Sequence, residues 1–300
     1  MFIDINGDVR YKVGLHIHTT NSDGRATPEQ SARLYKEAGY DMIALTDHWK
    51  FGEQQVLEGI NVMSGAEYNT PGADAASGIY HIVALGCERA PMLQKTDSPQ
   101  TIVDEINRCG GMAVLAHPAW SLNNAYDASR IKGFGATEIY NTVSGKHFSS
   151  RPYSGDFVDT SAVIGVAYNL LATDDAHFYD NDMRYSATYV KAESAEPKDI
   201  LRALKAGDFY CGAGPQIFVS QEGNICRVRC TPAVYVRIYS NIVYARGRRY
   251  SGKAVTEFEC ELTANDRYIR AEVTDAEGRV GYTSVIKIDQ SFLKILPKKV

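Results

Sequence analysis

Short apolar runs recur along the N-terminal part of the chain, and most of them end at a polar side chain. The runs that we predict to be buried strands cover residues 42–46, 60–66, 79–85, 112–116, 136–140 and 164–167. Helix signals lie between them: residues 27–30 (Thr-Pro-Glu-Gln) form a capping box with a first-turn proline, and Ser98 precedes a proline that begins a second helix. Strands that alternate with helices predict a parallel α/β barrel or a doubly wound sheet.

The pattern changes after Pro215, where apolar and polar residues alternate with a period of two. Residues 234–239 and 269–273 show this alternation, which is typical of antiparallel strands with one exposed face. Residues 275–278 (Asp-Ala-Glu-Gly) give a hairpin-turn signal. We therefore predict a first domain at residues 1–215 and a small antiparallel β-sandwich at residues 216–300. The sequence leaves open whether the sandwich mediates oligomerisation, covers the site or binds a ligand.

The composition is that of an ordinary globular protein, with 44% hydrophobic and 23% charged residues among 300. A formal net charge of −4 gives no general attraction to phosphate backbones, so extended nucleic-acid binding is disfavoured. The chain start lacks the features of a signal peptide, and no apolar run approaches the ~18 residues that a membrane span needs. Six cysteines are scattered without a Cys-x-x-Cys pair, as expected for reduced thiols. These features predict a cytoplasmic protein without a membrane partner.

Histidines and acids gather at the predicted strand ends. Side chains alternate along an extended strand, so His16 and His18 point to the same side, and Asp23 follows at loop distance. A single such histidine is more often a hydrogen-bonded core residue than a ligand. However, six of the seven histidines fall within or at the ends of predicted strands, at positions 16, 18, 48, 81, 117 and 177. Because strand ends converge in an α/β barrel, this distribution predicts a multinuclear metal site.

The order His-x-His, Asp, Thr-Asp-His, Glu, His, His-Pro and Asp-Ala-His resembles the PHP (polymerase and histidinol phosphatase) family of metal-dependent phosphoesterases over about residues 13–214. The resemblance implies a distorted (β/α)7 barrel with a trinuclear site. Carried over by position, it implies three ligand groups: His16, His18, Glu67 and Asp175; Glu67, His81 and His117; Asp23, His48 and His177. The ions, two or three per chain, are Zn, Fe or Mn, because mixed nitrogen and oxygen ligands suit all three.

Such a site hydrolyses a phosphate mono- or diester through a metal-bridged hydroxide. We assign the catalytic role to Glu67, Asp175 and His177. Asp175 is preferred over Asp174 because its spacing places it on the same face as His177. Asp47 and Asp174 are candidates for orienting the neighbouring histidines.

A small phosphorylated substrate or nucleotide needs cationic contacts near the strand ends. Arg25, His147 and Arg184 are the candidates for this role, with Lys146 and Arg151 as further ones. Four aromatic residues flank the predicted ligands and could stack a base or sugar: Trp49, Phe51, Phe178 and Tyr179. Two other functions stay open, a carboxyl-ester or carbamate hydrolase that uses the same metals and a non-catalytic, metal-stabilised binding module.

Overall fold

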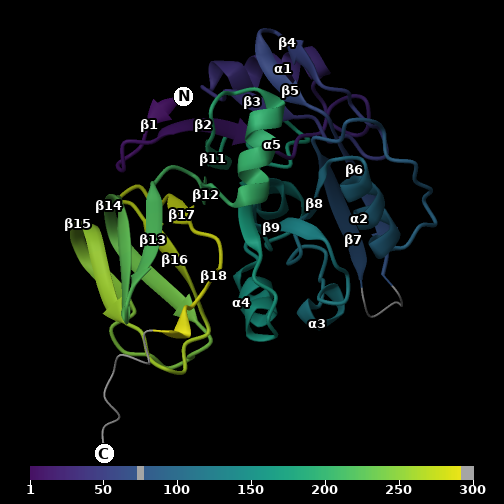
Figure 1. The fold of residues 1–300 in the computed structure, drawn as a ribbon. Helices are drawn as coiled ribbons and strands as arrows, with labels where there is room; N and C mark the ends of the chain where they lie inside the picture. The colour runs from purple at the N-terminus through teal and green to yellow at the C-terminus, as the bar shows by residue number, and fades with distance from the viewer. Residues whose placement is uncertain (73–77, 292–300) are drawn as a thin grey trace, which may run out of the picture.

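The computed structural model describes residues 1–72 and 78–291 and shows a mixed α/β protein (Figure 1). Its helices are α1 (Pro28–Glu37), α2 (Pro99–Arg108), α3 (Ala125–Ala128), α4 (Gly155–Val163) and α5 (Pro197–Ala206), with a π-helical turn η2 at Ser144–Phe148. The first strands are β1 (Phe2–Ile3), β2 (Val9–Gly14), β3 (Met42–Ala44), β4 (Gln55–Leu57), β5 (Ile60–Met63), β6 (Gly65–Pro71), β7 (Ile79–Leu85), β8 (Met112–Leu115) and β9 (Phe134–Asn141). The remaining strands are β10 (Asn169–Thr173), β11 (Ala187–Lys191), β12 (Phe209–Gly212), β13 (Ile217–Glu222), β14 (Ile225–Ser240), β15 (Arg249–Glu261), β16 (Tyr268–Thr274), β17 (Val280–Tyr282) and β18 (Ile286–Lys287).

Local helix signals are confirmed where the sequence contains them. Thr27 caps α1 and receives the reciprocal hydrogen bond from the Gln30 side chain, as a capping box requires. Ser98 caps α2, whose first residue is a proline. Both helices turn apolar side chains toward buried strands, so each covers one face of a sheet.

The strands of the N-terminal part divide between two sheets instead of closing one continuous barrel. A five-stranded sheet has the order β10-β9-β8-β7-β6, and β2, β3, β5 and β4 belong to a larger sheet. Isolated bridges such as His48 to Glu67 and Ile17 to Ala176 join the two. The distorted barrel expected from the sequence is therefore not closed. Most of the candidate ligands lie just beyond the ends of its strands, whereas Glu67 on β6 and His81 on β7 lie within a regular ladder.

Three predicted strands differ from the structure. β7 pairs antiparallel with both β6 and β8. The short connection between Pro71 and Ile79 leaves no room for the crossover helix that a parallel β6–β7 pair would need. The predicted strand at residues 164–167 is displaced: Ile164 ends α4, and the strand is β10 at Asn169–Thr173. The single strand predicted at residues 60–66 is broken at Ser64 into β5 and β6, which belong to different sheets. The remaining predicted strands of this part lie where the apolar runs placed them.

The C-terminal strands extend the larger sheet, whose order runs β13-β14-β16-β17-β12-β11-β2. In Figure 1 they form a lobe beside the N-terminal part, with β12 and β17 between the two. Gly212 lies at this crossing with φ of 139°, and a Cβ there would lie 2.2 Å from the Val280 carbonyl oxygen. Only glycine allows β12 and β17 to approach this closely.

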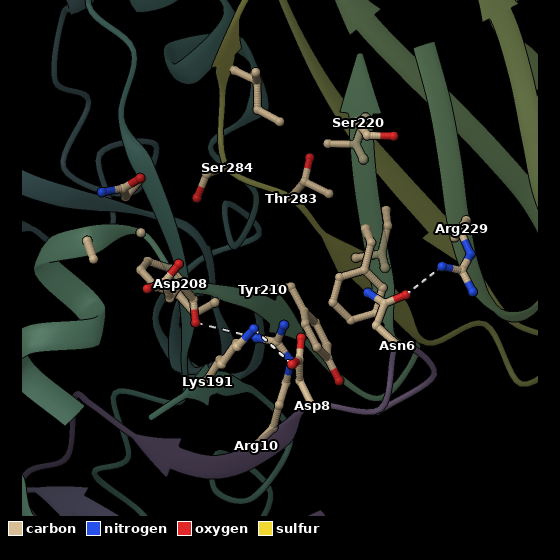
Figure 2. Close-up of a pocket in the computed structure, with 18 of the residues that line it drawn as sticks. Asn6, Asp8, Arg10, Lys191, Asp208, Tyr210, Ser220, Arg229, Thr283 and Ser284 are labelled. Atoms are coloured by element: carbon tan, nitrogen blue, oxygen red, sulfur yellow. Dashed lines mark hydrogen bonds and ion pairs between the residues drawn. The ribbon is translucent and has the colours of Figure 1, made fainter. Parts of the chain in front are cut away.

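A cavity of about 650 Å³ lies where the lobe meets the N-terminal part. Figure 2 shows polar side chains reaching into it from both sides. Lys191 pairs with Asp8 at 2.8 Å on the N-terminal side of the cavity, and Arg229 on β14 donates a hydrogen bond to Asn6 at 2.8 Å. The Arg229 contact joins the lobe to the N-terminal part. Within the described residues, none of the helices has the length and apolar character of a membrane span.

Candidate metal centre

His16 and His18 follow the end of β2, and both side chains are completely buried. Their Nε2 atoms lie 3.1 Å apart. Both Nε2 atoms lie 3.2 Å from Asp175 Oδ1. Glu67 Oε2 lies 3.4 Å from His16 Nε2 and 3.2 Å from His18 Nε2. Five of the six distances among these four atoms are thus 3.1–3.4 Å, and all four atoms lie within 4.8 Å of one another. A regular tetrahedron with edges of that length has its centre about 2 Å from each corner, which is the length of a zinc–imidazole or zinc–carboxylate bond.

Glu67 turns its two oxygens toward different histidines. Oε2 faces His16 and His18 and lies 3.2 Å from His48 Nδ1. Oε1 lies 2.9 Å from His81 Nδ1 and 3.3 Å from His117 Nε2. The carboxylate therefore connects two groups of histidines, as a bridging ligand would.

Asp23, His48 and His177 form a third group at the more exposed side of the site. Asp23 Oδ1 is 3.5 Å from His177 Nε2, and Asp23 Oδ2 is 3.8 Å from His48 Nε2. His18 also belongs here, because its Nδ1 lies 3.5 Å from Asp23 Oδ1. Asp23 is the most exposed of these side chains, at 55%. The structure thus gathers all nine predicted ligands around one point.

Several histidines are oriented by hydrogen bonds on their far side. His16 Nδ1 donates to Glu138 Oε1 at 2.7 Å, and His177 Nδ1 donates to the Asp175 carbonyl oxygen at 2.7 Å. His117 Nδ1 lies 3.0 Å from Ser121 Oγ. Because these contacts occupy Nδ1, they leave Nε2 to face the site.

Glu138, within β9, is a buried site residue that the sequence reasoning missed. Besides His16, it accepts hydrogen bonds from the backbone N–H of His117 at 2.9 Å and from Thr173 Oγ1 at 2.7 Å. Asn141 donates to Glu138 at 2.8 Å and to Asp175 at 3.2 Å. One signal in the sequence could have identified it: Glu138 is a charged residue in the apolar run at residues 136–140, and the neighbouring strands also carry their candidate ligands in or after apolar runs.

The charges in the site favour a cation between the carboxylates. Burial disfavours an imidazolium at His18, but Asp175 and Glu67 outweigh it and raise the pKa of His18 to about 9. Burial raises the pKa of Glu67, yet the charge of His16 holds that pKa well below its usual value. Burial lowers the pKa of His48 and favours the neutral imidazole, which is the metal-binding form. Metal binding replaces such protons, so the donor set suits divalent ions.

Two buried atoms support this fit. Within the described part of the chain, His48 Nδ1 and Asp175 Oδ1 are buried and make no hydrogen bond, although each lies 3.2 Å from an atom of a neighbouring candidate ligand. Buried polar atoms without partners are rare and call for an ion or a water. Both atoms point into the groups that could hold an ion, so the residues present fit divalent metals.

Asp47 and Asp174 do not contact the histidines through their side chains. Asp47 accepts hydrogen bonds from the Thr19 backbone N–H and from Ser22 Oγ, both at 2.7 Å, and so fixes the loop between His18 and Asp23. Asp174 accepts from Tyr35 and from three consecutive backbone N–H groups at residues 184–186. Both carboxylates position loops.

The loop between β10 and β11 is also held by Asp182, which is completely buried. Its carboxylate accepts hydrogen bonds from the backbone N–H groups of His177, Phe178 and Tyr179 at 2.7–2.8 Å. This contact fixes the backbone at the ligand His177.

The three predicted substrate contacts lie outside the cavity among the candidate ligands. Arg25 and His147 meet at the Phe178 ring, at 4.6 Å and 4.0 Å from its centroid. His147 also pairs with Asp180 at 2.9 Å. Arg184 is exposed, and its backbone N–H is bound by Asp174. None of the three residues lines the cavity, so their contact with a substrate stays a prediction.

The aromatic side chain that lines this cavity is Trp120, which the sequence did not single out. Trp49 instead donates to Asn69 at 2.8 Å, and the Tyr179 hydroxyl donates to the His18 carbonyl oxygen at 2.6 Å. Phe51 packs against the core. These three side chains therefore have structural partners.

No family model and no curated protein matches this chain. Among solved structures, the chain is similar to a two-domain protein from Bacteroides vulgatus described as containing a predicted PHP-like metal-dependent phosphoesterase. That likeness has a TM-score of 0.55 and 15% identity over 94% of this chain and 97% of that chain. An amidohydrolase from Chromobacterium violaceum with bound sulfate and no metal gives a TM-score of 0.44 and 16% identity over 65% and 96%. The first likeness confirms the PHP-type resemblance at the level of the fold.

Proposed function

We propose that this protein is a metal-dependent phosphoesterase that hydrolyses a small phosphorylated substrate. The observation that carries the proposal is the convergence of His16, His18, Glu67 and Asp175 to within 4.8 Å of one another, with the second oxygen of Glu67 turned toward two further histidines. The Asp23 group adds a third place for an ion, so the proposed site is trinuclear.

Hydrolysis of a phosphate ester forms a bond from a water oxygen to phosphorus, breaks the bond to the ester oxygen and gives the departing oxygen a proton. Bound divalent ions lower the pKa of water and neutralise charge on the attacking and leaving oxygens. Glu67 and Asp175 would supply carboxylates that hold the ions without cancelling their charge. The remaining ligands apart from Asp23 are imidazoles, which would bind in the neutral form, so the loaded site would keep the positive charge that a phosphoryl group needs.

The side chains around the ligands keep them in place during turnover. Asn141 donates to Asp175 Oδ2 and leaves Oδ1 toward the site. Glu138 fixes His16, and the Asp175 carbonyl oxygen fixes His177. Arg25, His147 and Arg184 remain the proposed contacts of the substrate outside the cavity.

Turnover of three model esters tests this function. The protein is stripped of metal, reconstituted with Mn or Zn, analysed for its metal content, and assayed with p-nitrophenyl phosphate, bis-p-nitrophenyl phosphate and p-nitrophenyl acetate. We expect two or three ions per chain and metal-dependent turnover of a phosphate ester. Turnover of the acetate alone would indicate a carboxyl-ester hydrolase. Metal binding without turnover of any ester would indicate a binding module.

A further inference from the structure

The cavity above the candidate ligands is small. Its volume is about 180 Å³, below the range of roughly 300–1,000 Å³ in which drug-sized ligands bind. Most of the residues that line it carry polar side chains: Asp23, His48, Glu67, His81, His117, Ser144, Asp175 and His177. Within the described residues, Trp120 is the one large apolar side chain in this lining. Trp120 therefore offers a substrate the one large apolar surface here that does not belong to a candidate metal ligand.

Trp120 is held beside two of the ligands. Its ring lies 5.0 Å from the His117 ring and 5.6 Å from the His81 ring, at interplanar angles of 85° and 78°. The loop that carries it is closed by backbone hydrogen bonds from Ser121 to His117 at 3.1 Å and from Asn123 to Pro118 at 2.9 Å. The indole is thus a fixed wall of the cavity.

Ser144 lines the same cavity and is equally constrained. Its hydroxyl donates to Asn141 Oδ1 at 2.7 Å, and its backbone N–H donates to the same oxygen at 3.1 Å. Ser144 is almost completely buried. Because both residues are fixed, the cavity cannot widen by simple rotation of either side chain.

We propose that Trp120 is a specificity-determining residue that contacts the single carbon substituent of a phosphate monoester and excludes diesters. This inference rests on the proposed phosphoesterase function and narrows its substrate class. Because the Trp120 ring occupies the side of the cavity beside His81 and His117, the second carbon substituent of a diester would lie against charged carboxylates and metal-binding imidazoles. Removing water from such groups without replacing their hydrogen bonds is costly.

Enlarging the cavity tests the proposal. Trp120→Ala, Trp120→Phe and Trp49→Phe are compared with the unchanged protein for kcat/KM on p-nitrophenyl phosphate and bis-p-nitrophenyl phosphate, at equal metal content and with intact circular dichroism. We expect the unchanged protein to prefer the monoester and Trp120→Ala to raise the diester-to-monoester ratio by about tenfold or more. Trp120→Phe and Trp49→Phe keep an aromatic ring at each position, so their diester-to-monoester ratio should stay near that of the unchanged protein.

Fluorescence gives a second measurement that does not depend on turnover. The chain has two tryptophans, so Trp120 is the remaining emitter in the Trp49→Phe variant. We expect phenylphosphonate, a non-hydrolysable monoester mimic, to change this emission saturably in the metal-loaded protein. An unchanged emission while phenylphosphonate binds by calorimetry would overturn the proposed contact and would be decisive if Trp120→Ala failed to fold.

The two proposals fail in distinguishable ways. If the unchanged protein hydrolyses phosphate esters but Trp120→Ala leaves the ratio unaltered, the specificity role is wrong and the phosphoesterase function stands. If the metal-loaded protein hydrolyses neither phosphate ester, the phosphoesterase function is wrong and the specificity role falls with it.

Discussion

Glu67 is the candidate ligand whose loss should affect most of the site, because its two oxygens face different groups of histidines. An amide in its place keeps the shape but removes the charge that offsets two closely spaced cations. We expect Glu67→Gln to lower metal affinity about 100-fold or more and to empty two positions together. Metal stoichiometry by elemental analysis, measured beside the hydrolysis rate, checks this expectation.

Asp23→Asn is the matched comparison, since Asp23 belongs to the third group alone. This variant should lose at most one ion per chain and keep the remainder. The bridging role of Glu67 would be wrong if Glu67→Gln kept its full metal content and rate, or if Asp23→Asn emptied every position while the fold persisted.

Glu138 acts on the site through His16 and the backbone of His117. Replacing it by Gln removes the charge that supports the His16 ring, and we expect metal affinity to fall about 10- to 100-fold. The comparison is Thr137→Ser, which keeps the hydroxyl that donates to the Leu115 carbonyl oxygen one position earlier on β9. Competition with a metal-binding dye measures the metal affinity of both variants. Equal affinity of the Glu138→Gln variant and the unchanged protein would remove Glu138 from its positioning role.

Most of the site could be predicted from the sequence at the residue scale, because the ligand types are chemically distinctive and follow apolar runs. Glu138 could not be recognised in the same way, because the histidine that it contacts, His16, is 122 residues away in the sequence. Trp120 was missed for a related reason: which aromatic ring faces a cavity depends on how a loop folds. Arg184 shows the same limit, because an exposed side chain is placed by its loop and not by its spacing.

The loop between β10 and β11 depends on Asp182, whose carboxylate accepts three consecutive backbone N–H groups. Asp182→Ala would leave these buried donors without their acceptor, at a cost of about 1–3 kcal/mol for each unsatisfied group. We expect the backbone at His177 to shift and the Asp23 group to lose its ion first. Asn181→Ala, an exposed change in the same loop, is the control. Loss of metal from the control, or full occupancy in Asp182→Ala, would contradict this role.

Elements were predictable where their signals are local. The caps of α1 and α2 depend on residues within one turn, so both helices begin where the sequence placed them. Strand direction is not local: the apolar run of β7 looks the same whether its neighbours run parallel or antiparallel. Its orientation followed from the short connection to β6, and β10 was displaced because α4 continues through apolar residues to Val163.

At the scale of the whole molecule, the pairing of β17 with β12 joins the C-terminal strands to the larger sheet. No local sequence pattern predicts this contact. The pairing brings together residues that are far apart in the sequence, such as Cys211 and Tyr282. Period-two alternation predicted the C-terminal strands but not which strand they would join.

Arg270, on β16, is the buried charge that ties this lobe to α4. Its Nε and Nη2 donate to the Asp159 carboxylate at 2.7 Å each, it pairs with Glu272 on the same strand, and its guanidinium lies 3.8 Å from the Tyr239 ring centroid. The side chain is 1% exposed. Burial opposes the charge, but Asp159 and Glu272 outweigh it and hold the pKa of Arg270 well above its usual value.

Removing this side chain should cost far more than removing an exposed arginine, because Glu272 would remain buried without its cation. We expect Arg270→Ala to lower the free energy of unfolding by about 3–5 kcal/mol in urea titrations. Arg270→Lys should recover only part of that loss, since an ammonium cannot form the two-pronged contact with Asp159. Arg267→Ala, an exposed change just before β16, should shift the urea midpoint little. Equal midpoints for Arg270→Ala and Arg267→Ala would show that the ion network contributes nothing to holding the lobe against α4.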